Sequence, residues 1–185
     1  MLNDVYKEAR ERMDGSIQAL EDDLAGIRTG RAHPALVEKL MVEYYGVPTP
    51  LIQLASISIP EPRSLLIRPF DASSLRDIER SIQTSDLGLT PNNDGKTIRL
   101  NLPPLTEDRR RELVKIVNHR IEEARVSVRN VRRDSIKDLR EFENEKMISE
   151  DDLKRGEDEM QKITDGYIDK INQIGERKER EILEV

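Results

Sequence analysis

An amphipathic helix is predicted over residues 1–30. Its apolar positions fall three or four residues apart and charged residues fill the gaps, which is the period of a helix with one buried face. These positions are Tyr6, Ala9, Met13, Ile17, Leu20, Leu24 and Ile27. Thr29-Gly30, with Pro34 just beyond, is a typical helix end.

Two more long helices are predicted in the last part of the chain. Residues 105–148 contain no Gly or Pro, and they carry an apolar seam with 4-3-4-3 spacing that is typical of packing against a partner helix. The seam consists of Val117, Ile121, Ala124, Val128 and Val131. Residues 149–152 resemble a capping box and indicate the start of a third helix, which continues to the end of the chain.

Residues 35–103 have a different pattern, typical of a small domain that is mostly β with one short helix. Residues 37–45 are rich in β-formers, and the Gly- and Pro-containing run 46–50 is predicted to end that strand. Further strands are predicted over 56–59, 65–70 and 97–102. Between the last two, Ser73 or Ser74 is expected to cap a helix with the apolar face Leu75, Ile78 and Ile82.

The fold class predicted from these elements is α+β. A single amphipathic helix cannot bury its apolar stripe alone, so the first helix is expected to pack with the last two. Residues 1–30 and 105–185 then form an elongated antiparallel three-helix bundle, interrupted by an inserted domain of residues 31–104. The two connections form either a hinge or a fixed elbow, and the candidate hinge residues are Thr29, Gly30, Arg31, Ala32, Pro103, Pro104 and Leu105.

Composition excludes several classes of protein. Hydrophobic residues make up 36% of the chain, charged residues 37% and aromatic residues 3%, which favours long helices meeting along narrow seams over a deep core. Cysteine is absent, so disulfides and thiolate metal sites are excluded. No apolar run approaches the roughly 20 residues of a membrane span, and residues 1–7 lack the pattern of a targeting leader. We expect a cytoplasmic protein with no membrane partner.

Charge is unevenly distributed along the chain. The net charge is −6, but residues 105–140 contain eleven basic and seven acidic residues, a net charge of +4. Residues 141–185 contain eight basic and fifteen acidic residues, a net charge of −7. An anionic partner is therefore expected to meet the basic segment.

No catalytic residue, metal site or cofactor is predicted. His33 and His119 lack a metal-ligand neighbour at helical spacing, and no Gly-rich phosphate loop is present. The acids 150–152 lie at a predicted helix start, where capping explains them. Tyr44 and Tyr45 would suit base stacking, but adjacent strand residues point to opposite faces, so one is expected in the core.

Arginines gather on one face of the 105–148 helix. Arg125, Arg129, Arg132, Arg133 and Arg140 fall within a sector of roughly 100°, centred roughly 120° from the apolar seam. Arginine forms planar two-pronged bonds to phosphate. The sequence leaves a solvated face and an anion-binding surface both open. Arg28 and Arg31 either extend the basic surface or cap the end of the first helix.

Six segments, in the same order along almost the whole chain, resemble ribosome recycling factors. They are residues 27–32, 42–51, 85–88, 102–107, 124–133 and 148–152. The resemblance implies an L-shaped molecule of roughly transfer-RNA outline, with a three-helix bundle and a small β/α/β domain whose two hinges let it swing. Residues 42–51 would be the first hairpin of that domain.

The resemblance also implies a function. The family dissociates the post-termination ribosome together with elongation factor G, using GTP hydrolysis by that partner. The bundle tip and the arginine helix would contact large-subunit ribosomal RNA near the peptidyl-transferase centre. By motif match Arg132 is expected to matter most, supported by Arg28, Arg31 and Arg129, and Arg125 and Arg133 complete the predicted RNA-binding set. We expect a monomer that is not an enzyme.

Two other classes of protein remain as alternatives. A structural or chaperone-like coiled-coil protein would be favoured by exposed apolar residues at the heptad edges, whereas the arginine sector and the inserted domain argue against it. An enzyme is the less favoured of the two and ranks third after the recycling-factor and coiled-coil readings, because no set of nucleophile, base and orienting group can be assembled from the sequence.

Overall fold

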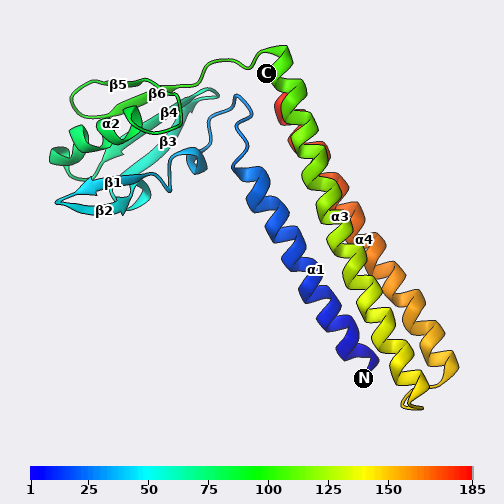
Figure 1. Cartoon of the computed structure of the whole chain (residues 1–185). Coiled ribbons are helices and arrows are strands. Elements are labelled where there is room, and N and C mark those ends of the chain that lie inside the picture. The colour runs from blue at the N-terminus through cyan, green and yellow to red at the C-terminus, as the bar shows by residue number, and fades with distance from the viewer. Residues whose placement is uncertain (185) are drawn as a thin grey trace. The chain divides into compact units, whose positions relative to one another are not determined.

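The structure is a computed structural model that describes residues 1–184, and contacts divide it into two compact units. The first unit contains Met1–Ile27 and Arg111–Leu183, and the second contains Arg28–Arg110 with Glu184. The fold class is α+β, as predicted: three long helices form the first unit, and small sheets with a short helix form the second (Figure 1). Val185, the last residue of the predicted bundle, lies outside the described residues.

The helices of the first unit are α1 (Leu2–Ala25), α3 (Glu107–Asn144) and α4 (Glu150–Leu183). α3 runs antiparallel to α1 and α4 (Figure 1). The five seam positions predicted on α3 are all buried, which confirms the period of that helix. α1 ends five residues before the predicted stop at Gly30, because Gly26 already leaves the helix and Thr29 and Gly30 belong to the second unit.

The connection between α3 and α4 follows standard helix-end chemistry. Lys146 adopts a left-handed φ of 57°, and the Met147 N–H donates to the Phe142 carbonyl at 2.8 Å, which closes the end of α3. The Asp152 N–H then donates to Ser149 Oγ at 3.0 Å, and the Ser149 N–H donates to Asp152 Oδ2 at 3.2 Å. These reciprocal bonds confirm the predicted capping box, and they hold the pKa of Asp152 below its ordinary value.

The second unit contains two antiparallel sheets and one short helix. β1 (Met41–Tyr44) and β2 (Val47–Pro50) form a hairpin. β3 (Ala55–Glu61), β4 (Ser64–Pro69), β6 (Ile98–Asn101) and β5 (Pro91–Asn93) form a four-stranded sheet in the order β3-β4-β6-β5. α2 (Leu75–Gln83) buries Leu75, Ile78 and Ile82, the apolar face predicted for it.

β1 ends at Tyr44, so the prediction that the run 46–50 ends this strand is confirmed, and residues 47–50 of that run form β2, the second strand of the hairpin that the resemblance implies. Tyr45 and Gly46, with φ of 49° and 77°, make the two-residue left-handed turn that hairpins favour. Pro48 pairs with Glu43 and Pro50 with Met41, so both prolines occupy alternate positions of an edge strand. Those positions need no N–H donor toward the partner strand, so proline is tolerated there.

Two smaller features of the second unit differ from the sequence predictions. β5 was not predicted, because its three residues are too few to show a period. Ser74 is the N-cap residue of α2, as predicted, but its side chain makes no capping hydrogen bond; the turn before it is capped by Asp71, whose Oδ1 accepts the Ser73 N–H at 2.9 Å. Asp71 suits this position because a carboxylate is a strong acceptor for exposed N–H groups at a helix start.

One buried hydroxyl links α4 to α1 and gives the bundle a pH dependence. Tyr167 Oη donates to Asp14 Oδ1 at 2.6 Å, and burial together with this carboxylate raises the pKa of Tyr167 from 10.0 to about 12. The folded state favours the neutral phenol, so its stabilising effect is complete below pH 10 and is lost as the pH rises to about 12.

We expect the Tyr167→Phe variant to lose stability less steeply than the wild type over this window. Urea unfolding followed by helical circular dichroism at several pH values measures the two slopes. Tyr45→Phe, at the exposed turn of the second unit, is the matched control and should keep the wild-type slope. Equal slopes for Tyr167→Phe and the wild type would mean that this hydroxyl does not couple folding to pH.

Candidate nucleic-acid interface

The arginines of α3 divide into two rows according to their partners. Arg125, Arg132 and Arg140 each donate a hydrogen bond to a side chain of α4. Arg129 and Arg133 are exposed and make no contact of this kind with α4. The helical period predicted one arginine face, and the structure shows that the neighbouring helix already engages part of it.

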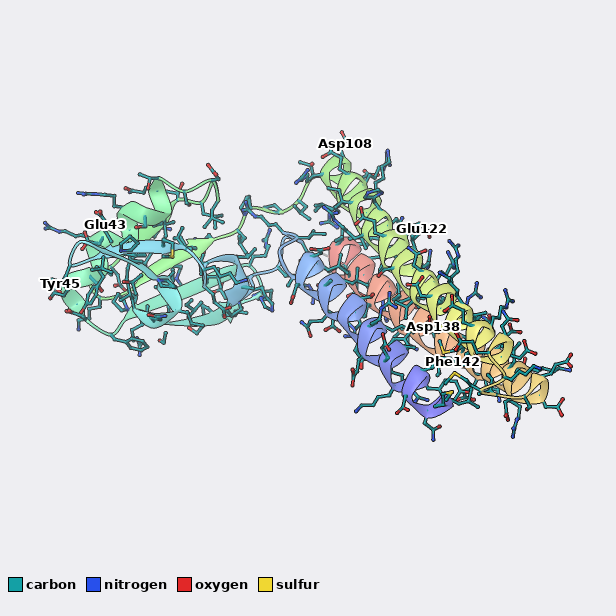
Figure 2. All side chains as sticks on the ribbon, turned by 60° about the horizontal axis from the view of Figure 1, so that its bottom comes forward. Glu43, Tyr45, Asp108, Glu122, Asp138 and Phe142 are labelled. Atoms are coloured by element: carbon teal, nitrogen blue, oxygen red, sulfur yellow. The ribbon has the colours of Figure 1, made fainter. Side chains whose placement is uncertain are left out.

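Arg125 is the most engaged member of the predicted RNA-binding set. Its Nε and Nη2 donate to Asn172 Oδ1 at 3.0 and 2.6 Å, and its Nη1 donates to Glu122 Oε2 at 3.1 Å. Glu122 lies on α3 (Figure 2), and its other oxygen is 3.5 Å from Arg129 Nη1. One carboxylate therefore partly neutralises two arginines of the predicted RNA-binding set.

Arg132 is half-buried and is held in one orientation. Its Nη1 donates to Gln161 Oε1 at 2.7 Å, and its Nε is buried without a hydrogen-bond partner. The Gln161 amide is fixed in turn, because its Nε2 donates to Asp165 Oδ1 at 2.8 Å. No described side chain bonds to Nη2 of Arg132, so this end of the guanidinium remains available to a ligand.

A shallow basic hollow lies on α3 beside Arg132. It has a volume of about 380 Å³ and is lined by Arg132, Arg133, Ile136, Lys137 and Arg140. Arg133 makes no ion pair or hydrogen bond within residues 1–184, whereas Lys137 lies 3.9 Å from Glu141 and Arg140 lies 2.9 Å from Glu157. Arg132 and Arg133, the two lining cations with no carboxylate partner in the described structure, provide a favourable potential for a phosphate group.

Arg28 and Arg31 lie in the second unit and not on the arginine face of α3. Arg28 does not cap α1; its Nη1 donates to the Leu87 carbonyl at 3.0 Å, and its Nη2 is buried without a partner. Arg31 forms an ion pair with Glu184 at 3.5 Å. The structure therefore brings together four members of the predicted RNA-binding set, Arg125, Arg129, Arg132 and Arg133.

The first connection is tied to the second unit. Thr29 is buried, the Ala32 N–H donates to the Pro62 carbonyl at 2.8 Å, and Gly30 has a φ of 83°. A Cβ at Gly30 would lie 3.2 Å from Leu105 Cγ, so this position favours glycine through both its backbone and its surroundings. In the second connection Pro103 and Pro104 are exposed.

Sequence reasoning missed the α4 side chains that hold the arginines, and Asp165, which orients one of them. Glu157, Gln161, Asp165 and Asn172 lie four, four and seven residues apart, a polar stripe at helical spacing. That spacing could have predicted a polar face on α4, although it does not show which arginine each acceptor contacts. Of the tyrosine pair, Tyr44 is half-buried against the core and donates to Asp71 at 3.1 Å, while Tyr45 is 79% exposed because it lies in the turn and not, as predicted, in the strand.

The described part of the chain contains neither a candidate metal site nor a membrane-spanning helix. No group of three or more His, Asp or Glu side chains within residues 1–184 is placed to hold a metal ion. His119 instead contacts Glu123 at 2.9 Å, and His33 Nδ1 accepts the Ala35 N–H. None of the described helices combines the length and the apolar character needed to cross a membrane.

Comparison of the sequence with known proteins identifies many relatives of one kind. The model of the ribosome recycling factor family matches residues 20–183. The ribosome-recycling factor of Chloroflexus aurantiacus is 56% identical over 185 residues, which are 100% of each chain. That of Dehalococcoides mccartyi is 52% identical, again over 100% of each chain.

Solved structures agree with the sequence comparison. The solution structure of a ribosome recycling factor matches with a TM-score of 0.78 at 46% identity, over 100% of this chain and 98% of that chain. A second match is the T. thermophilus ribosome recycling factor, described with E. coli elongation factor G bound to the E. coli post-termination complex. Its TM-score is 0.69 at 48% identity, over 99% of each chain.

Proposed function

The chain belongs to the ribosome recycling factor family, and we propose that it binds the post-termination ribosome and dissociates it into subunits. Elongation factor G is the partner, and its GTP hydrolysis supplies the energy. The chain itself contributes binding surfaces and no catalytic group. It acts as a monomer in the cytoplasm, where translation takes place.

Large-subunit ribosomal RNA near the peptidyl-transferase centre is the docking site in this proposal. The observation that carries it is the basic hollow on α3, with Arg132 held at its edge and Arg133 unpaired within the described structure. Phosphate contacts of this kind release counterions, so affinity falls steeply with salt. Specificity comes from the shape of the RNA, because paired RNA hides its base edges from a helix.

Movement of the second unit relative to the bundle is the second part of the proposal. The two connections between the units, residues 26–32 and 103–105, carry this movement when elongation factor G pushes. The contacts of Ala32 and Gly30 within the second unit favour bending close to residues 26–28, where α1 ends and the unit boundary lies. Gly26 at the end of α1 offers the flexibility that such a bend needs.

Co-sedimentation with bacterial ribosomes at about 50 and 200 mM salt tests the docking. We expect tight binding at low salt that weakens at least tenfold at the higher concentration, because several phosphate contacts are lost together. Subunit splitting, followed by light scattering, should require elongation factor G and GTP in addition to the chain.

Absence of binding at low salt would contradict the proposal and favour the coiled-coil alternative. α3 does expose Ile116 and Val126 at 39% and 47%. Four charged residues lie between these two along the helix, and single exposed apolar residues are ordinary on protein surfaces. They do not form the continuous apolar edge that a coiled-coil partner would need.

A further inference from the structure

The three α4 acceptors differ in charge. Asn172 and Gln161 are neutral amides and hold Arg125 and Arg132, whereas Glu157 is a carboxylate and holds Arg140 at 2.9 Å. An amide oxygen accepts a hydrogen bond from a guanidinium and leaves the positive charge intact. A carboxylate accepts the same bond and cancels the charge.

The amide of Gln161 orients the guanidinium of Arg132 without neutralising its positive charge. The bond from Nη1 to Gln161 Oε1, at 2.7 Å, fixes the plane of the guanidinium. The bond from Gln161 Nε2 to Asp165 fixes which end of the amide faces the arginine. A long side chain that is already ordered loses less rotamer freedom on binding a ligand.

We propose that Gln161 is a positioning residue, which presents the guanidinium of Arg132 to a phosphate of ribosomal RNA while leaving its charge uncancelled. Asp165 acts one step further out by orienting the Gln161 amide. This inference rests on the proposed function, because it takes Arg132 as an RNA contact. It adds a role for α4, a helix whose net charge is acidic and which would otherwise only pack against α3.

A purely structural role for Gln161 leads to the opposite expectation for one substitution. Gln161→Glu keeps the length of the side chain and still accepts the bond from Arg132, now as an ion pair. If the bond only joins two helices, the ion pair with Arg132 offsets the lost bond to Asp165, so this variant changes stability little and ribosome binding is unchanged. If Gln161 preserves the charge of Arg132, the variant folds normally and binds weakly.

Co-sedimentation with bacterial ribosomes across a salt series distinguishes the two roles. We expect Gln161→Glu to bind about tenfold more weakly at low salt, since a carboxylate at contact distance opposes a phosphate. The slope of log affinity against log salt should fall by about one, as for the loss of one phosphate contact. Helical circular dichroism should match the wild type, and the urea midpoint should stay close to it, because the ion pair with Arg132 offsets the lost bond to Asp165.

Gln173→Glu is the matched control, because Gln173 is an exposed residue of α4 with no side-chain partner in the described structure. It makes the same change of net charge and should keep the wild-type affinity and salt slope. Gln161→Met keeps the length of the side chain and lacks the acceptor. It should bind a few-fold more weakly with an unchanged slope, because Arg132 stays charged but loses its fixed orientation.

Three outcomes decide the inference. If Gln161→Glu binds like Gln173→Glu while Arg132→Ala loses affinity, the positioning role is overturned and the proposed function stands. If Arg132→Ala also binds like the wild type, the proposed RNA contact fails together with the inference. If Gln161→Glu does not fold, Gln161→Met decides, because wild-type binding by that variant overturns the positioning role.

Discussion

Arg132→Ala is expected to lower the affinity of the chain for bacterial ribosomes at least tenfold. A hydrogen bond that involves a charged group is worth about 1.5–3 kcal/mol, and each 1.4 kcal/mol is a factor of ten. The guanidinium of Arg132 lies at the basic hollow with Nη2 unoccupied by any described side chain, so an RNA phosphate would find a preoriented donor there. Co-sedimentation at about 50 and 200 mM salt measures the loss.

Arg120→Ala is the matched control for Arg132→Ala. Arg120 lies on the same helix outside the arginine sector, and it is paired with Glu123 at 3.1 Å. It should bind ribosomes like the wild type, because the basic hollow does not include it. Equal losses in the two variants would mean that only overall charge matters, and equal wild-type affinities would mean that Arg132 is not an RNA contact.

The long helices could be predicted from the sequence because each buries one continuous stripe. The seam of α3 repeats every three or four residues over fifteen positions, and every predicted member is buried. A period of that length leaves no alternative assignment. β5, with three residues, and β2, with two prolines, carry no comparable repeat, so they become strands only through pairing with β6 and β1.

The candidate site could be predicted only in part, for a related reason. The angular spacing of a single helix places the arginines of α3 on one face. Which of them stays free depends on acceptors from α4, and those depend on the register between two helices. Asn172 and Gln161 therefore change the roles of Arg125 and Arg132 in a way that the period of α3 does not reveal.

The partners of Arg28 and Arg31 could not be predicted from the sequence either, because both lie far away along the chain. The position of the two arginines just after the first helix suggested a cap or an extension of the basic surface, and both readings use only local sequence. The partner of Arg28 is the carbonyl of Leu87, which is distant along the chain. Contacts of this kind follow from the folding of the second unit, and no local sequence motif predicts them.

Gly175→Val is expected to destabilise the bundle by about 3 kcal/mol, at the upper end of the usual cost of overpacking. A Cβ at Gly175 would lie 2.9 Å from both Cγ1 and Cδ1 of Ile121, a fully packed seam residue of α3. The two methyl groups of valine need more space still. To relieve this clash, α3 and α4 would have to move apart. That movement would also lengthen the hydrogen bonds between the α3 arginines and α4. Urea unfolding followed by helical circular dichroism measures the loss.

The same substitution at Gly166 separates crowding from helix propensity. Gly166 lies on α4 with nothing within 4 Å of a Cβ, so Gly166→Val should stay within about 0.5 kcal/mol of the wild type. Ile121→Ala alone should cost about 2–5 kcal/mol through the cavity it leaves. Combined with Gly175→Val it should cost less than the sum, since the valine fills that cavity. Additive losses, or equal stabilities of the two valine variants, would show that α3 does not require glycine at this contact.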